Sequence, residues 1–146
     1  RELKINDINK GVVAFWYCTT QRTDELIRLI ETTEVNIKKA KEIKAFYIEY
    51  RNQEITTMHK DLILKLGFSF FYLNRVNFSG IIQAGIIGGN EQKSEYNISC
   101  RFNKQILIER IKEISLKKAQ IKVTNTDELI YSYSPYHRNQ FKIQKI

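Results

Sequence analysis

The side chains best suited to recognition chemistry lie in the range Phe68–Asn103. An apolar, aromatic run is followed at once by the polar pair Asn74-Arg75, and Phe78 then stands next to Ser79-Gly80, where a helix cannot comfortably continue. Amides, guanidinium groups and exposed aromatic rings are the groups that read base edges and wedge between base steps. The stretch therefore predicts an element that presents side chains to DNA.

The second half of this stretch predicts a loop and a hairpin. Its glycines are Gly80, Gly85, Gly88 and Gly89. The segment Tyr96–Asn103 then alternates apolar and polar residues, which suits a short exposed strand.

Two carboxylates follow predicted strands. Glu2–Asn6 alternates and ends at Asp7, and Ile121–Thr124 ends before Asn125-Thr126-Asp127. A carboxylate at the carboxyl end of a strand in an α/β sheet is placed to accept the hydroxyls of a ribose. The alternatives are that Asp7 caps the next helix and that Asp127 belongs to a turn.

Helices are predicted between these two strands, so the pattern is α/β with a mainly helical middle. The expected helices are an apolar-periodic segment from Ile8 to Trp16, Asp24–Ile30 capped by Thr23, Val35–Arg51, a helix through Leu62–Phe71 capped by Thr56 or Thr57, and Ile106–Ile114. Lysines gather on the predicted helix Val35–Arg51, at Lys38, Lys39, Lys41 and Lys44. They either contact phosphate or form a solvated helix face.

Composition places the chain among globular proteins. Its 146 residues are 42% hydrophobic and 27% charged, which indicates one domain or a piece of one, large enough to bury a core. The net charge of +8 fits either an anionic partner, such as nucleic acid, or the plainer alternative of a solvated basic surface. Two cysteines make no disulfide framework, which favours a cytoplasmic protein, and neither a membrane span nor a metal-ligand cluster is expected.

At these residues the chain resembles the Dam-like adenine-specific DNA methyltransferases. The family signature is a Leu-Asn-Arg triplet, a Phe-Asn-Gly-Leu turn and a later Phe-Asn. Leu73–Arg75 and Phe102-Asn103 match it, and Phe78–Ile81 matches with Ser for Asn. Asn6–Asn9 matches the Asn-Asp-Ile-Asn motif of the family, and Asn125–Asp127 matches its Asn-x-Asp motif. The longer segments that contain these motifs are similar to those of a phage-like branch of the family.

The resemblance implies a Rossmann-like class I methyltransferase fold with an inserted, mainly helical DNA-recognition domain. Residues 1–20 would form the edge of the cofactor domain, 21–105 the recognition domain and 106–146 the return to the cofactor domain. S-adenosylmethionine is the implied cofactor, with Asp7 at its ribose and Asp127 at its adenine. Double-stranded DNA is the implied partner, beside a cognate restriction endonuclease. The implied DNA contacts are Asn74, Arg75, Asn77, Phe78, Ser79, Ile81, Gln83, Arg101 and Asn103.

Gln83 departs from the family at a residue that reads DNA. Relatives carry an Arg there, three residues after the turn glycine, and it contacts a guanine. Gln offers one donor and one acceptor, which match adenine better than guanine. The alternative is that Gln83 contacts phosphate or packs in the hairpin.

The sequence at the expected catalytic motif also departs from the family pattern. A catalytically active member of the family has a Gly-rich motif before the position of Asp7 and an Asp-Pro-Pro-Tyr motif after the position of Asp127. The nearest counterpart is Tyr133–Tyr136, in which Pro135 and Tyr136 match but Tyr stands for the catalytic Asp. The chain is then either a non-catalytic relative or one from which the catalytic segment is omitted. Asp127 runs directly into Glu128–Ile130 without the usual helix, which favours omission.

Overall fold

The two expected strands pair with each other. A computed structural model describes residues 1–125, in which β1 (Leu3–Asn6) runs parallel to β2 (Ile121–Thr124). Leu3 faces Ile121 and Asn6 faces Thr124. Parallel neighbours require a crossover, and here it is the whole segment 7–120. The expected α/β pattern is confirmed for this strand pair.

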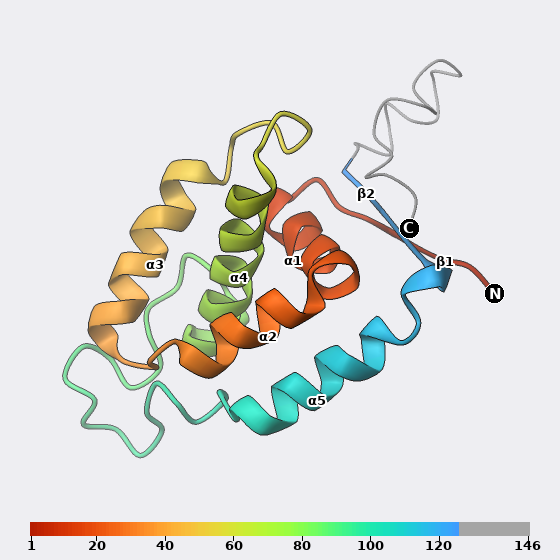
Figure 1. Ribbon diagram of the computed structural model, residues 1–146. Coiled ribbons are helices and arrows are strands. Elements are labelled where there is room, and N and C mark those ends of the chain that lie inside the picture. The colour runs from red at the N-terminus through yellow and green to blue at the C-terminus, as the bar shows by residue number, and fades with distance from the viewer. Residues whose placement is uncertain (126–146) are drawn as a thin grey trace.

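The crossover is mainly helical. Its α-helices are α1 (Lys10–Gln21), α2 (Thr23–Thr32), α3 (Ile37–Tyr50), α4 (Lys60–Val76) and α5 (Lys104–Ser115). Both strands lie at one side of these helices, and α5 runs beside α2 back toward the strands (Figure 1). The helices fall close to the predicted ranges. No helix in residues 1–125 has the length and apolar character needed to cross a membrane.

Two predicted helix caps are wrong. The hydroxyl of Thr23 donates to the carbonyl of Thr19 at 2.8 Å, because α2 follows α1 so closely that the preceding turn supplies the nearest acceptor. Helix α4 begins after His59, not after Thr56 or Thr57, and the His59 ring nitrogen accepts from the backbone amide two residues later at 3.3 Å. Sequence placed the helices but not their first residues.

Close packing of α1 on α4 sets the direction of α4. A Cβ at Gly67 would lie 2.6 Å from the carbonyl oxygen of Ala14, so glycine permits this approach of the two backbones. Phe15 stacks on Phe71 with ring centroids 5.5 Å apart, and the side chain of Tyr72 is fully buried. The rigid packing of α4 fixes the place where its last turn delivers Asn74-Arg75, as the sequence predicts.

The strand expected at Tyr96–Asn103 does not form. Consecutive turns replace it, with Cys100 N–H donating to the Asn97 carbonyl at 3.1 Å and Phe102 N–H to the Ser99 carbonyl at 2.8 Å. A strand that buries residues 98 and 102 would also bury residue 100. Ile98 and Phe102 are each 6% exposed, whereas Cys100 is exposed. The predicted hairpin is therefore wrong: the segment anchors to the core through two separated apolar side chains.

Candidate nucleic-acid interface

A tight turn follows α4 and is closed by backbone hydrogen bonds. Residues Asn77 and Ile86 form an isolated antiparallel bridge, and Phe78 N–H donates to the Gly85 carbonyl at 2.9 Å. Between them Ser79 and Gly80 have φ values of 53° and 71°. Glycine suits the second position, because it adopts this conformation without strain. We call residues 77–86 the recognition turn.

Two asparagines brace the recognition turn from within. The Asn74 amide donates to the Gly80 carbonyl at 3.1 Å, and the Asn77 amide donates to the Ile82 carbonyl at 2.8 Å. Asn77 is 0% exposed, so its side chain cannot meet DNA unless the turn rearranges. The expectation for Asn77 is corrected accordingly: it supports the residues that are presented and is not presented itself. Asn74 is half-buried and has the same bracing role.

The outer surface of the recognition turn is apolar with polar edges. Phe78 is 63% exposed and Ile81 is 59% exposed, although both are large apolar side chains. Ser79 and Gln83 are exposed beside them. Exposed rings and aliphatic groups on a braced turn can enter a groove or separate base steps, and the Gln83 amide can pair with a base edge.

Helix α3 holds the far side of the turn. The Lys44 ammonium group donates to the Ala84 carbonyl at 3.3 Å and reaches the Gln83 carbonyl at 3.5 Å. Lys44 is half-buried, so this member of the lysine group belongs neither to a solvated face nor to a free phosphate site. Lys39 pairs with Glu42 on the same helix. The run of lysines gave no signal that would separate Lys44 from its neighbours.

The remaining predicted DNA contacts lie where α4 ends and α5 begins. Arg75 is half-buried in the last turn of α4, and its Nε is buried without a hydrogen-bond partner. Burial, then the charges of Arg101 and Arg110, lower the pKa of Arg75. Asn103 is exposed and caps α5, with its side-chain oxygen accepting from Ile106 N–H at 3.1 Å.

The carboxyl ends of the two strands form a second candidate site. Asp7 Oδ1 accepts from Asn9 N–H at 2.7 Å, and Asn9 is the residue that caps α1. The interpretation of Asp7 as a helix cap is therefore wrong. Asn125 donates to the Asp7 carbonyl at 2.7 Å and so joins the end of β1 to the end of β2. Asp127, Pro135 and Tyr136 lie outside the described residues.

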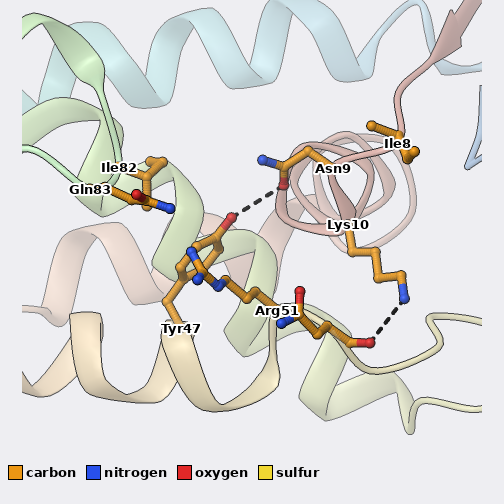
Figure 2. A pocket seen from close by; sticks show the side chains of 8 residues that line it. Ile8, Asn9, Lys10, Tyr47, Arg51, Ile82 and Gln83 are labelled. Atoms are coloured by element: carbon orange, nitrogen blue, oxygen red, sulfur yellow. Dashed lines mark hydrogen bonds between the residues drawn. The ribbon is translucent and has the colours of Figure 1, made fainter.

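An open pocket of about 500 Å³ lies between this strand edge and the recognition turn. It is lined by Ile8, Asn9, Lys10, Tyr47, Arg51, Asn52, Ile82 and Gln83. Figure 2 shows Tyr47 directing its hydroxyl toward Asn9, to which it donates at 3.2 Å, while Lys10 reaches away to the Asn52 carbonyl at 3.1 Å. Burial raises the pKa of Tyr47, so its hydroxyl keeps its proton. The pocket carries amide, phenol and guanidinium groups, and of its lining residues only Gln83 was predicted to contact a ligand.

The described part of the chain contains no group of three or more His, Cys, Asp or Glu that could hold a metal ion.

The described residues combine a parallel strand pair, which has a carboxylate at its carboxyl end, with a mainly helical segment that carries a braced and exposed turn. The profile of the D12 class N6 adenine-specific DNA methyltransferases matches residues 1–138. The chain belongs to this family of Dam-like adenine methyltransferases. Comparison with curated proteins and with solved structures gave no match.

Proposed function

We propose that the full-length protein transfers a methyl group from S-adenosylmethionine to the exocyclic amino group of an adenine in double-stranded DNA. The observation that carries this proposal is the recognition turn, which exposes Phe78, Ile81 and Gln83 beside a pocket that reaches the strand edge at Ile8-Asn9. An exposed apolar turn needs a partner to cover it. Family membership supports DNA as that partner.

The strand edge fits the methyl donor. Asp7 is half-buried, and Asn9 N–H occupies one of its carboxylate oxygens. The other oxygen has no partner in residues 1–125 and can accept from a ribose hydroxyl. S-adenosylmethionine supplies an electrophilic methyl group on sulfur. We assign Asp7 to its ribose and Asp127 to its adenine.

DNA recognition is assigned to three groups of residues. Phe78, Ser79 and Ile81 would enter the groove at the target, and Gln83 would read a base edge there. Arg75, Arg101 and Asn103 would meet the backbone, where phosphate contacts set position but not sequence. Asn74 and Asn77 would act indirectly, by keeping the turn in shape. Such a turn can hold the duplex while the adenine leaves the stack, which is how enzymes reach a base inside DNA.

The fold proposed for the whole is a Rossmann-like cofactor domain with the helical segment inserted into it. The parallel neighbours β1 and β2 support this proposal, since one strand precedes the helical segment and the other follows it. The proposed division keeps residues 1–20 and 106–146 with the cofactor domain and 21–105 with recognition. We place this activity in the cytoplasm, with no metal in the reaction.

Calorimetric titration of the full-length protein with S-adenosylmethionine tests the enzyme proposal. We expect saturable binding that S-adenosylhomocysteine competes away. A protein that binds duplex DNA but neither of these compounds would be a non-catalytic DNA-binding module.

A further inference from the structure

Asn9 connects the carboxyl end of β1 to helix α3. Its backbone N–H donates to Asp7 Oδ1 at 2.7 Å, and its side-chain oxygen accepts from the amides of Gly11 and Val12 at 2.9 and 3.4 Å. The same oxygen accepts from the hydroxyl of Tyr47 at 3.2 Å (Figure 2). Asn9 therefore holds the carboxylate that we assign to the ribose, and is itself held from α3.

The side chain of Tyr47 is packed so that its hydroxyl has little freedom to move. Tyr47 is 3% exposed, and its ring lies against Phe70 of α4 with centroids 6.4 Å apart. A Cβ at Gly11 would lie 2.7 Å from the Tyr47 hydroxyl oxygen, so a glycine at the start of α1 makes room for the phenol. Because burial raises the pKa of Tyr47, the hydroxyl remains a donor near neutral pH.

The hydrogen bond from Asn9 orients the side chain of Asp7. The backbone of Asp7 is fixed by the end of β2, since its N–H donates to the Thr124 carbonyl at 3.2 Å and its carbonyl accepts from Asn125 at 2.7 Å. Within residues 1–125, Asn9 is the one hydrogen-bond donor to the Asp7 carboxylate. A group that is held in place before its ligand arrives binds more tightly, because less freedom is lost on binding.

We propose that Tyr47 is a positioning residue for the methyl donor: through Asn9 it holds the Asp7 carboxylate in place for the ribose hydroxyls of S-adenosylmethionine. This proposal rests on the proposed function, which assigns Asp7 to the ribose. Tyr47 belongs to residues 21–105, the segment assigned to DNA recognition, so that segment also supports the cofactor site. Lys44, three residues earlier in α3, holds the recognition turn. Helix α3 therefore supports both sites.

Tyr47→Phe removes only the hydroxyl, and Tyr72→Phe is its matched control. Tyr72 is also a buried tyrosine, and its hydroxyl donates to the Glu34 carbonyl at 2.9 Å, in the link between α2 and α3. Each variant loses one neutral hydrogen bond, so both should become less stable by similar amounts. Only the Tyr47 hydroxyl contacts a residue that holds Asp7.

The test measures binding of S-adenosylmethionine to the full-length protein by calorimetry. We expect Tyr47→Phe to weaken binding by about two- to tenfold, as the loss of one neutral hydrogen bond predicts, and Tyr72→Phe to keep the wild-type affinity. In the Asp7→Ala background, Tyr47→Phe should cause no further loss, because residues that act through one another are not additive. Thermal unfolding checks that each variant is folded.

The failures can be told apart. If Asp7→Ala weakens cofactor binding but Tyr47→Phe has the wild-type affinity, the hydroxyl only joins α3 to α1, and the proposed function stands without the positioning role. Equal losses from Tyr47→Phe in the wild-type and Asp7→Ala backgrounds, or an equal loss in Tyr72→Phe, would also overturn that role. If Asp7→Ala binds as tightly as the wild type, Asp7 is not at the ribose and the role of Tyr47 falls with it. A wild-type protein that binds no S-adenosylmethionine would overturn the proposed function itself.

Discussion

The side-chain amide of Asn77 donates a 2.8 Å hydrogen bond to the carbonyl of Ile82, across the base of the recognition turn. Ile82 lies between Ile81 and Gln83, which are two of the side chains that the turn exposes. A fully buried residue thus fixes the backbone that presents them. Its other side-chain atom, Oδ1, is buried without a partner in the described residues, so Asn77 is retained in spite of an incompletely satisfied amide.

We predict that Asn77→Ala weakens DNA discrimination more than it weakens folding. The loss of one neutral hydrogen bond should lower the free energy of unfolding by about 1 kcal/mol, whereas a loosened turn no longer holds Ile81 and Gln83 in place. Denaturant titration gives the first quantity, and the ratio of affinities for target and mixed-sequence duplexes gives the second. Asn90→Ala, at an exposed loop residue, is the control. An unchanged affinity ratio in Asn77→Ala would show that the brace is irrelevant to recognition.

We predict that Asp7→Ala weakens binding of S-adenosylmethionine and leaves affinity for DNA unchanged. The loss of a carboxylate that accepts from a hydroxyl should reduce cofactor binding by about 1.5–3 kcal/mol. Calorimetry on the full-length variant measures this change. Asp24→Ala, in the exposed first turn of α2, is the control for loss of a negative charge. Equal cofactor affinity in Asp7→Ala and the wild type would remove Asp7 from the cofactor site.

We predict that Gln83→Arg changes the DNA sequence that is methylated. Gln83 is exposed, and within residues 1–125 only its backbone carbonyl is engaged, by Lys44, which leaves its amide available to pair with adenine. Arg pairs instead with the two acceptors of guanine, and a good bidentate contact discriminates by about 1–3 kcal/mol. We expect the wild-type target to differ from GATC, with an adenine where relatives take guanine. Sequencing methylated adenines after treatment with each protein decides this, and one shared motif would mean that Gln83 reads no base.

We predict that the two cysteines differ in reactivity. Burial raises the pKa of Cys18 to about 12, and its thiol is fully buried, whereas Cys100 is exposed. The thiolate is the reactive form, so near pH 8 a thiol reagent should modify Cys100 alone in the folded protein and both residues in denaturant. Mass spectrometry of the labelled peptides identifies the site. Rapid labelling of Cys18 under native conditions would mean that the core around α1 opens readily.

Periodicity placed the main elements because the spacing of apolar residues is a property of neighbouring positions in the sequence. Helices such as α3 and α4 repeat apolar residues at helical spacing, and β1 and β2 alternate over their whole length. The end of α4 at Asn74-Arg75 followed from the same pattern. The segment Tyr96–Asn103 misled for the same reason, since its alternation came from two core anchors joined by turns.

The recognition turn was found by residue type, but the roles within it were not. Nothing in the sequence separates Asn77, which is buried, from Ser79, which is exposed, because the distinction depends on how α4 directs the chain. Contacts between distant segments were equally hidden. Lys44 reaches the turn from α3, a contact between residues about 40 positions apart that only the folded chain forms.

The central claim is methyl transfer to adenine, and one assay tests it most directly. The full-length protein is incubated with duplex DNA and S-adenosylmethionine labelled in its methyl group, and the DNA is then digested to nucleosides for mass spectrometry. We predict labelled N6-methyladenine and no labelled cytosine. Unlabelled adenine from a protein that binds both the duplex and S-adenosylmethionine under the same conditions would contradict the account.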